Sequence, residues 1–505
     1  MSSNANLFAH FKRHFPSDHK TELLATADGR SVSYREADEA SARIANCLVA
    51  LGAKSGDRVT VQVEKSVENL FLYLACLRAG LVYHPLNTAY KASELEYFLG
   101  NAEPTIVVCD ADSLATIELA LSATEAGPGV NALLTLNADG NGTLTEKANT
   151  NSADFEAAEV LGSDMAALLY SSGTTGQPKG IMLSHDNLRK NAETLVSAWG
   201  FNATDRLLHM LPIYHVHGLF VGVSCVLMSG ASMVWHSGYS DSAAVAALPG
   251  CTVMMGVPTY YTRLLSNPNF GSACCTNMRL FVSGSAPLLS ETFEDFQTRC
   301  GHTILERYGM TETGMNTSNP LEGERRAGTV GPALPGVTAR VVDDAGEVLP
   351  VGETGNLQVQ GPNVFPGYWR MPEKTAEDFT EDGFFNTGDK ATKDADGYVS
   401  IVGRSKDMII SGGLNVYPKE IELVIDDMAG VKESAVVGVS HADFGEVALA
   451  VIVPDSEAPS GDEVIAHCRA LLANFKVPKR VETIDALPRN AMGKVQKNLL
   501  RERFG

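Results

Sequence analysis

The chain alternates segments of helical periodicity with short apolar runs that end in Gly, Ser or Pro. Residues 36–54 repeat apolar side chains at helical spacing, and the apolar run 57–63 follows directly. Residues 66–80 form a second helical pattern, and the same rhythm continues to the run 278–286. This alternation is typical of α/β proteins, in which helices cover the faces of a sheet. Because ligands of open α/β sheets bind beyond the carboxyl ends of the strands, we expect functional residues where these runs end.

The rhythm changes twice along the chain. From about residue 330 it gives way to short β-like pieces with frequent turns, which predicts a small β-rich subdomain over 330–404. Residues 405–505 alternate helix and strand again. Since one hydrophobic core rarely serves more than about 250 to 300 residues, a chain of 505 residues requires at least two domains. We predict an α/β fold with a large N-terminal domain of layered α/β sheets, 1–404, and a mobile α+β C-terminal domain, 405–505.

Charge and hydropathy exclude several classes of partner. The formal net charge of −20 repels polyanions, so we expect neither a nucleic-acid partner nor binding to an anionic membrane surface. Residues 218–235 are apolar enough to suggest a transmembrane helix, but they contain three serines and lack a basic flank, which favours a buried helix that runs into a core strand. The start of the chain lacks the apolar core of a signal peptide. These features predict a cytoplasmic protein with no integral membrane segment and no obligatory protein partner.

The cysteines carry no pattern of a metal site. None of the nine belongs to a CxxC pair or lies at metal-ligand spacing with histidine, which is typical of reduced thiols in a cytosolic protein. The adjacent Cys274 and Cys275 leave a redox pair open as an alternative.

Residues 171–180 read SSGTTGQPKG and lie between two apolar runs. Glycines let backbone N–H groups turn toward an anion, while the hydroxyls and Lys179 add donors and positive charge. The stretch is not a Walker A loop, because the chain has no GxxxxGK[ST] sequence and Val495 follows the pair Gly493 and Lys494. Taken alone, it fits a phosphate-binding loop and a surface turn equally well.

Four further motifs follow this loop in a fixed order. They are ERYGMTET at 306–313, NTGD at 386–389, GRSKDMIISGGLNVYPKEIE at 403–422 and PRNAMGKVQK at 488–497. Together with the loop they resemble the acyl-adenylate-forming superfamily, which includes acyl-CoA synthetases, luciferases and the adenylation domains of peptide synthetases. The resemblance covers nearly the whole chain. It implies an enzyme that activates a carboxylic acid with ATP, with Mg²⁺ as the companion ion, and passes the acyl group to coenzyme A.

Additional segments are most similar to the malonyl-CoA synthetase branch of that superfamily. These are PIYHVHGLF at 212–220, GVPTYYTRLL at 256–265, MRLFVSGSAPL at 278–288 and GPNVFPGYWRMPEKT at 361–375. The resemblance implies conversion of malonate to malonyl-CoA with release of AMP and pyrophosphate. Methylmalonate or acetate as the acid, and a carrier protein as the acceptor, remain open. A silent nucleotide-binding relative would be expected to lack Lys494 or Glu312, and both are present.

The resemblance also implies which residues bind ATP. Thr174, Thr175 and Lys179 would hold the β- and γ-phosphates, and the adenine would rest against Tyr308. Asp389 would hold the ribose, because an ionised carboxylate can accept hydrogen bonds from both hydroxyls of a diol. The full implied set is Ser171, Thr174, Thr175, Lys179, Ser283, Gly284, Ser285, Ala286, Glu306, Tyr308, Gly309, Met310, Asp389 and Arg404.

Adenylation brings one anion onto another, so cations must neutralise the encounter. By resemblance, Lys494 would bridge the attacking carboxylate and the α-phosphate. Thr311 would contact the α-phosphate, and Glu312 would ligate Mg²⁺. Lys494 lies in the C-terminal domain whereas the nucleotide site lies in the large domain, so the small domain must close for adenylation and then rotate to admit the thiol.

The second half-reaction would use residues near the domain boundary. In the family the pivot is the second residue after the arginine of the GR pair, here Lys406. Ser411, Gly412 and Gly413 would line the coenzyme A tunnel, where a side chain at either glycine would block the thiol.

A dicarboxylate substrate requires a cation for its second carboxylate, because burying an unpaired charge is costly. Arg263 and Arg307 lie in pocket-forming motifs, and a planar guanidinium suits bidentate binding of a carboxylate. His217 is a further candidate for the acid site, with His215 as the second choice. An internal salt bridge for either arginine, or a core position for either histidine, remains the alternative.

Overall fold

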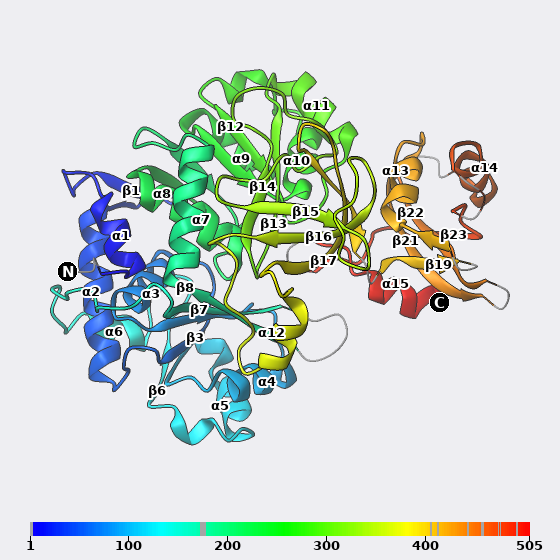
Figure 1. Ribbon diagram of the computed structural model, residues 1–505. Helices are drawn as coiled ribbons and strands as arrows, with labels where there is room; N and C mark the ends of the chain where they lie inside the picture. Colours follow the sequence, from blue (N-terminus) through cyan, green and yellow to red (C-terminus); the bar gives the residue numbers. More distant parts are fainter. Residues whose placement is uncertain are drawn as a thin grey trace.

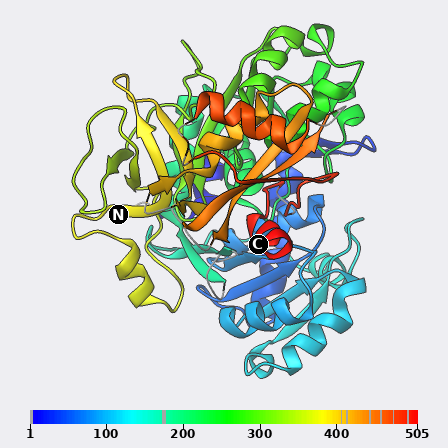
Figure 2. The same ribbon diagram turned by 90° about the vertical axis from the view of Figure 1, so that its right-hand side faces the viewer.

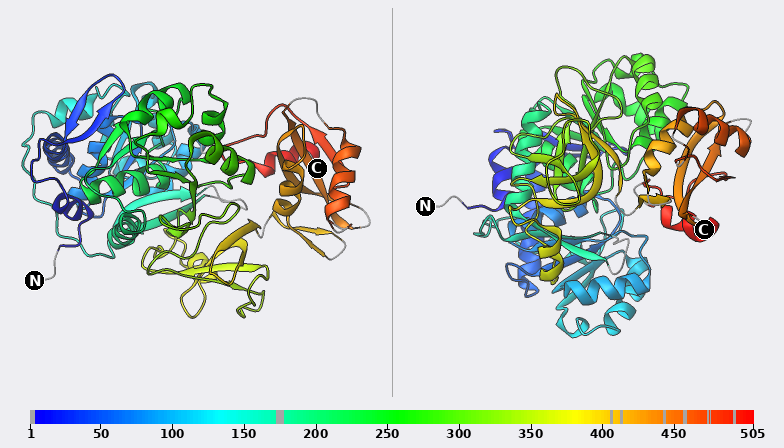
Figure 3. Two further views of the ribbon diagram at one scale, coloured as in Figure 1. Left: turned by 90° about the horizontal axis from the view of Figure 1, so that it is seen from above. Right: turned by 45° about the vertical axis from the view of Figure 1, so that its right-hand side comes forward.

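The computed structural model describes residues 4–171, 178–404, 407–411, 414–441, 444–455, 459–472, 474, 476–490 and 493–505. Thr174, Thr175, Lys406, Gly412 and Gly413 lie outside these residues. The chain forms a large domain of packed sheets and helices and a separate C-terminal domain that stands at one end of the molecule (Figures 1 and 3). The expected α/β class, with a β-rich part and an α+β C-terminal domain, is confirmed.

The first sheet of the large domain has the strand order β14-β13-β12-β11-β9-β10-β1-β2. The strands from β13 to β1 run parallel, and the edge strands β14 and β2 are antiparallel to their neighbours. The strands are β1 (Glu22–Thr26), β2 (Ser31–Ser33), β9 (Arg206–His209), β10 (Ser232–Trp235), β11 (Val253–Gly256), β12 (Leu280–Ser283), β13 (Ile304–Met310) and β14 (Gly314–Ser318).

The second sheet of the large domain has the order β6-β5-β3-β4-β7-β8. It is parallel up to β7, and β8 returns antiparallel, so the register pairs Ser171 with Lys179 at the two ends of the predicted phosphate loop. The strands are β3 (Arg58–Gln62), β4 (Val82–Pro85), β5 (Ile106–Cys109), β6 (Ala132–Thr135), β7 (Met165–Ser171) and β8 (Lys179–Ser184).

Helices cover the faces of both sheets (Figures 1 and 2). The predicted helix 36–54 is α2 (Tyr34–Ala50). It begins at a capping box formed by Ser33 and Glu36, and it ends before Gly52, which has a φ of 97°. The predicted helix 66–80 is α3 (Val67–Arg78). The others are α1 (Leu7–Arg13), α4 (Ala92–Ala102), α5 (Leu114–Ser122), α6 (Thr143–Ala148), α7 (His185–Ala198), α8 (Ser224–Ser229), α9 (Asp241–Ala247), α10 (Pro258–Ser266), α11 (Ser290–Cys300) and α12 (Pro372–Asp378), with short helical turns η1 (Ala111–Ser113), η2 (Gly127–Gly129), η4 (Leu248–Gly250) and η5 (Ser272–Cys275).

The apolar segment 218–235 lies inside the large domain. It forms the π-helix η3 (His217–Val223), the buried part of α8 and then the strand β10. This is the buried helix followed by a core strand that the sequence predicts. Among the described residues, none of the helices has the length and apolar character to cross a membrane.

The β-rich subdomain is an antiparallel sheet of order β15-β16-β17-β18. Its strands are β15 (Thr338–Val342), β16 (Gly355–Gln360), β17 (Phe385–Lys393) and β18 (Val399–Arg404). The last strand ends at Arg404, two residues before Lys406, the position predicted for the hinge.

The C-terminal domain is built around the strand β22 (Gly445–Pro454). Alternate residues of β22 point to opposite faces: Ala448, Ala450 and Ile452 pack under α13 and α14, while Leu449 and Val451 pack under α15. The other elements are β19 (Ile409–Ser411), β20 (Leu414–Val416), α13 (Pro418–Asp426), β21 (Val431–His441), α14 (Gly461–Leu471), β23 (Arg480–Thr483) and α15 (Lys497–Phe504).

Candidate active site

The predicted nucleotide motifs meet at the carboxyl ends of the parallel strands of the first sheet. Ser283 ends β12, and the register of the sheet places it between Gly256, which ends β11, and Glu306 in β13. The segments 283–286 and 306–312 are therefore neighbours in space. This is the position in which α/β sheets bind their ligands.

Asp389, in β17, is buried and both of its carboxylate oxygens have partners. Nε of Arg404 lies 2.7 Å from Oδ1, and the Tyr308 hydroxyl donates to Oδ2 at 2.5 Å. Burial raises the pKa of the Tyr308 hydroxyl well above its ordinary value, and the Asp389 charge raises it further, so the phenol stays protonated. Since an ionised carboxylate has further lone pairs, Asp389 can still accept hydrogen bonds from a ribose.

Glu312 lies close to Lys179 and Arg404. Its side chain is buried, and burial raises the pKa of Glu312 while the two cations counter the increase. Nζ of Lys179 lies 3.4 Å from the Tyr368 hydroxyl, 3.5 Å from Asp378 and 4.4 Å from the centroid of the Tyr368 ring. A buried carboxylate beside a lysine at the phosphate loop fits Mg²⁺, which proteins commonly hold through one or two carboxylates together with phosphate oxygens.

The C-terminal domain brings Lys494 to the same place. The Lys494 N–H donates to Asn490 Oδ1 at 3.0 Å, and the Asn490 N–H donates to the Lys494 carbonyl at 2.9 Å, so these two residues are bonded to each other. Desolvation by the surrounding protein lowers the pKa of Lys494, although part of the side chain remains exposed. The charge of Arg404 lowers this pKa further, whereas the charges of Asp389 and Glu312 raise it. The lysine thus lies among the charges of the candidate nucleotide site.

Arg307 is a buried cation that forms no ion pair within the part of the chain that the structure describes. It is 2% exposed, yet its Nε and Nη2 atoms have no hydrogen-bond partner among the described residues. Burial lowers the pKa of Arg307 to about 9, which leaves the guanidinium charged at neutral pH. An unpaired buried charge is strongly unfavourable, so the guanidinium is set up to receive an anion.

Two histidines and a glycine surround this guanidinium. Nδ1 of His217 lies 3.3 Å from Ser285 Oγ, and its Nε2 is buried without a hydrogen-bond partner in the described part of the chain. Burial and Arg307 lower the pKa of both histidines, that of His215 to about 4, so both are neutral at pH 7. A Cβ atom on Gly284 would lie 2.4 Å from Cζ of Arg307, so the guanidinium lies directly against the Gly284 backbone.

Arg263 does not join this group. It is exposed in the last turn of α10, whereas Tyr261 is buried, donates its hydroxyl to Val282 O at 2.6 Å and lies near Arg307. Two residues along an α-helix differ in direction by about 200°, so Arg263 points to the side opposite Tyr261. The expectation of two arginines in one pocket is therefore corrected: the structure brings Arg307 to the site and leaves Arg263 on the surface.

The structure describes some of the remaining predicted residues but not all of them. Gly309, Met310 and Thr311 follow Tyr308 along the chain at the strand-end site. Ser285 has a φ of 72°, and Ala286 is the next residue along the chain. Ser411 is buried at the end of β19. The structure gives no account of Thr174, Thr175, Lys406, Gly412 and Gly413, which lie outside the described residues.

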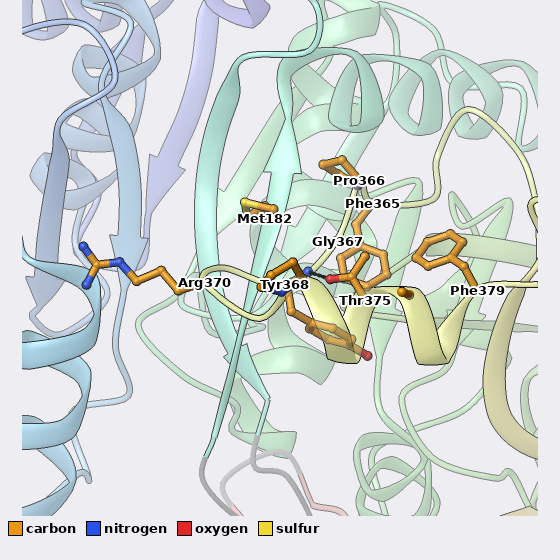
Figure 4. A pocket seen from close by; sticks show the side chains of 10 residues that line it. Met182, Phe365, Pro366, Gly367, Tyr368, Arg370, Thr375 and Phe379 are labelled. Atoms are coloured by element: carbon orange, nitrogen blue, oxygen red, sulfur yellow. Dashed lines mark hydrogen bonds between the residues drawn. The ribbon is translucent and has the colours of Figure 1, made fainter.

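Lys179 contacts Tyr368 and Asp378, and neither of these two residues could be identified from the sequence. The segment 361–375 carries a signal of the family but no signal of this contact, which depends on the packing of that segment against β8. Tyr368 also lines a pocket of about 560 Å³ between Met182 of β8 and Phe379, shown in Figure 4. This pocket is built from β8 and the segment 365–379 rather than from β12 and β13, so we assign the chemistry to the strand-end site.

The chain matches known families and individual relatives over most of its length. The model for an AMP-binding enzyme matches residues 10–369, and the model for an AMP-binding enzyme C-terminal domain matches residues 420–494. A feruloyl-CoA synthase from an Amycolatopsis species is 35% identical, covering 94% of this chain and 95% of that protein. A malonate–CoA ligase from Arabidopsis thaliana is 32% identical, covering 99% of this chain and 90% of that protein.

A solved structure of ATP-bound MatB from Rhodopseudomonas palustris is similar over 99% of both chains, with 52% identity and a TM-score of 0.96. The apo form of the same protein, also matched over 99% of both chains, gives a TM-score of 0.86. The arrangement of this chain is therefore nearer to the ATP-bound form than to the apo form.

Proposed function

Since the chain belongs to the AMP-binding enzyme family and is an AMP-forming acyl-CoA ligase, we propose that malonate is the acid it activates. Malonate would be converted to malonyl-CoA with release of AMP and pyrophosphate. Methylmalonate and acetate stay as the alternative acids. The family alone does not identify the acid, because a relative named for another acid, the feruloyl-CoA synthase, is also similar.

The buried and unpartnered guanidinium of Arg307 carries this proposal. A monocarboxylic acid has no anionic group left once its carboxylate has reacted, so the charge of Arg307 would stay uncompensated. The second carboxylate of a small dicarboxylate would pair with this guanidinium. The neutral His217 beside it adds a ring nitrogen, Nε2, that is free to bond to the same group. A long alkyl chain would place apolar atoms against this charge, which disfavours a fatty acid.

In the proposed adenylation step, the first carboxylate of the acid attacks the α-phosphate of ATP, and pyrophosphate leaves. Lys494 would hold the attacking carboxylate and the α-phosphate together, with Thr311 beside the phosphate. Lys179 would hold the departing pyrophosphate, and Asp389 with Tyr308 would fix the ribose. Preorganised donors of this kind stabilise charge as it develops in the transition state, which is the main source of catalysis in phosphoryl chemistry.

Mg²⁺, when bound by Glu312 and the phosphates, would neutralise part of the triphosphate charge. Within the described residues, no group of three or more histidine, cysteine or carboxylate side chains is arranged to hold a metal by itself. The ion would therefore arrive with the nucleotide.

In the proposed second step, the thiol of coenzyme A attacks the acyl carbon and AMP leaves. We place the pivot between the domains, 1–404 and 405–505, at Lys406, with Ser411, Gly412 and Gly413 along the path of the thiol. Rotation of the C-terminal domain would withdraw Lys494 from the acyl phosphate and open that path.

The direct test is ATP–pyrophosphate exchange with malonate, methylmalonate, acetate, succinate and octanoate. We expect malonate to give the fastest exchange at equal concentration. Faster exchange with acetate or octanoate would contradict the dicarboxylate assignment. A second assay, thioester formation with free coenzyme A, separates this function from loading of a carrier protein, which would show exchange without a coenzyme A product. A silent binding protein would show no exchange with any acid.

A further inference from the structure

Lys65 is a buried lysine that the reaction described above does not use. It lies between β3 and α3 and is 7% exposed. No ion pair links it to a carboxylate among the described residues, and burial lowers its pKa well below the ordinary lysine value. Keeping such a side chain in a protein interior is costly unless its amine is fully hydrogen-bonded.

The amine of Lys65 is fixed by two neighbouring strands of the first sheet. Its Nζ lies 2.8 Å from Nδ1 and 2.9 Å from the backbone oxygen of His209, at the end of β9. It also lies 4.2 Å from the ring centroid of Trp235, at the end of β10. The His209 and Trp235 rings stack, with centroids 4.8 Å apart and planes at 25°. The amine therefore donates a hydrogen bond to Nδ1 of His209. Neutral His209 then carries its single ring proton on Nε2.

His209 connects Lys65 to the π-helix η3 through a hydrogen bond. Its Nε2 lies 2.9 Å from the backbone oxygen of Gly218 and donates to it. A Cβ atom on Gly222 would lie 3.2 Å from the same ring, and a Cβ on Gly218 would lie 2.0 Å from Pro212 O, so both glycines let the helix lie close to its neighbours. The residue that begins this helix is His217, beside Arg307 and Ser285.

We propose that Lys65 is a positioning residue for the acid pocket, which acts through His209 to hold the first turn of η3 and with it the ring of His217. π-Helical turns are rare and are often found at functional sites, so such a turn needs specific contacts to hold it. The chain of contacts from Lys65 to His209, Gly218 and His217 supplies them. This inference rests on the proposed function only in placing His217 at the acid.

The test uses the whole enzyme with three variants that remove or preserve single links. Lys65→Met keeps the length of the side chain and removes the amine. His209→Gln keeps a donor at the Nε2 position, and His209→Asn keeps only the Nδ1 side. We expect Lys65→Met and His209→Asn to raise KM for the acid about threefold to tenfold, with KM for ATP within twofold of wild type. His209→Gln should return most of the acid affinity.

Lys390→Met is the matched control, because Lys390 is also buried, at 6% exposed, but pairs with Asp344 in the β-rich subdomain. It should leave KM for the acid unchanged. If Lys65→Met changes kcat or thermal stability while KM for the acid stays at the wild-type value, the residue is only structural and the proposal is wrong. Equal effects of His209→Gln and His209→Asn would also overturn it.

The measurement uses whichever acid wild-type enzyme exchanges best. Failure of malonate as substrate would therefore show in the wild-type enzyme, whereas failure of the positioning role would show only in the comparison of variants.

Discussion

The Tyr308 hydroxyl donates a hydrogen bond to Oδ2 of Asp389 across 2.5 Å. The two residues are 81 positions apart and belong to different sheets, β13 in the large α/β layer and β17 in the β-rich subdomain. Arg404 bonds to the other oxygen of the same carboxylate. This contact ties the subdomain to the strand ends and fixes the carboxylate that we assign to the ribose.

Tyr308→Phe should weaken the binding of ATP without removing activity. Loss of one hydrogen bond to a charged group costs about 1.5 to 3 kcal/mol, but Arg404 still holds Asp389, so we expect KM for ATP to rise about threefold to tenfold. KM for the acid should change less. Steady-state kinetics with each substrate varied in turn measures both values.

Tyr398→Phe is the control for this change, because its hydroxyl donates to Glu324 O at 2.8 Å on the exposed side of the subdomain. An unchanged KM for ATP in Tyr308→Phe would show that the hydroxyl does not help to place Asp389.

Arg307→Met should damage the use of the acid selectively. Truncating one partner of a buried charge pair costs about 2 to 5 kcal/mol, so kcat/KM for malonate should fall about 30-fold or more, while KM for ATP changes little. Relative activity with a monocarboxylate such as acetate should increase. Arg340→Met, which removes an arginine paired with Asp382 in the β-rich subdomain, is the control. An equal loss for malonate and acetate would contradict the assignment.

Gly284→Ala tests the role of the Arg307 guanidinium by displacing it rather than by removing it. A Cβ atom there would lie 2.4 Å from Cζ and 2.6 Å from Nε of Arg307, so the arginine must move. We expect a loss in kcat/KM for malonate of about tenfold or more, because displacement of a positioning group by about 1 Å costs on the order of 10²-fold. Gly250→Ala, at a position with open space around its Cβ, should be neutral. Wild-type kinetics in Gly284→Ala would show that Arg307 does not meet the acid.

The strand-end site could be predicted from the sequence because its signals are local. The apolar run that ends at 283–286 predicts a strand and the loop that follows it, and the motif at 306–313 marks the neighbouring segment through the family resemblance. Arg263 could not be placed in this way, because the helical pattern of 258–266 does not say which face meets the site. In the structure Tyr261 takes that face and Arg263 takes the other.

Contacts between distant segments were beyond sequence reasoning. The pairing of Lys179 with Tyr368 and Asp378, and that of Lys65 with His209, depends on packing between segments more than 140 residues apart. No periodicity or spacing within either segment encodes them. A buried lysine was likewise unexpected, since lysine is almost always found at the surface unless it is paired.

Lys494→Met should remove adenylation and spare the second half-reaction. Loss of one preorganised donor commonly costs about 10²- to 10³-fold in rate, so ATP–pyrophosphate exchange should fall by that factor. Thioester formation from a supplied acyl-adenylate and coenzyme A should stay within a few-fold of wild type. Lys479→Met, at an exposed lysine of the same domain, is the control. Equal loss of both half-reactions would contradict a role confined to adenylation.

Glu306 gives a prediction about stability and pH. Burial raises the pKa of Glu306 to about 8, although the Leu288 N–H donates to its Oε1 at 3.2 Å and partly opposes the shift; Oε2 has no hydrogen-bond partner in the described part of the chain. In the unfolded chain the group titrates near its ordinary value of 4.5. Between these values the native state holds a proton that the unfolded state has lost, so the free energy of unfolding falls as pH rises.

Glu306→Gln removes this titration while keeping the shape of the side chain. Its melting temperature relative to wild type should therefore increase steadily from pH 5 to pH 8, because only wild type loses stability through this group over that range. The histidines of the acid site, whose pKa values burial lowers, act in the opposite direction below pH 6.5, but they are present in both proteins and cancel in the difference. Thermal unfolding of both proteins in one buffer series measures the difference, and a value that stays constant across the range would show that Glu306 is ionised in the native protein.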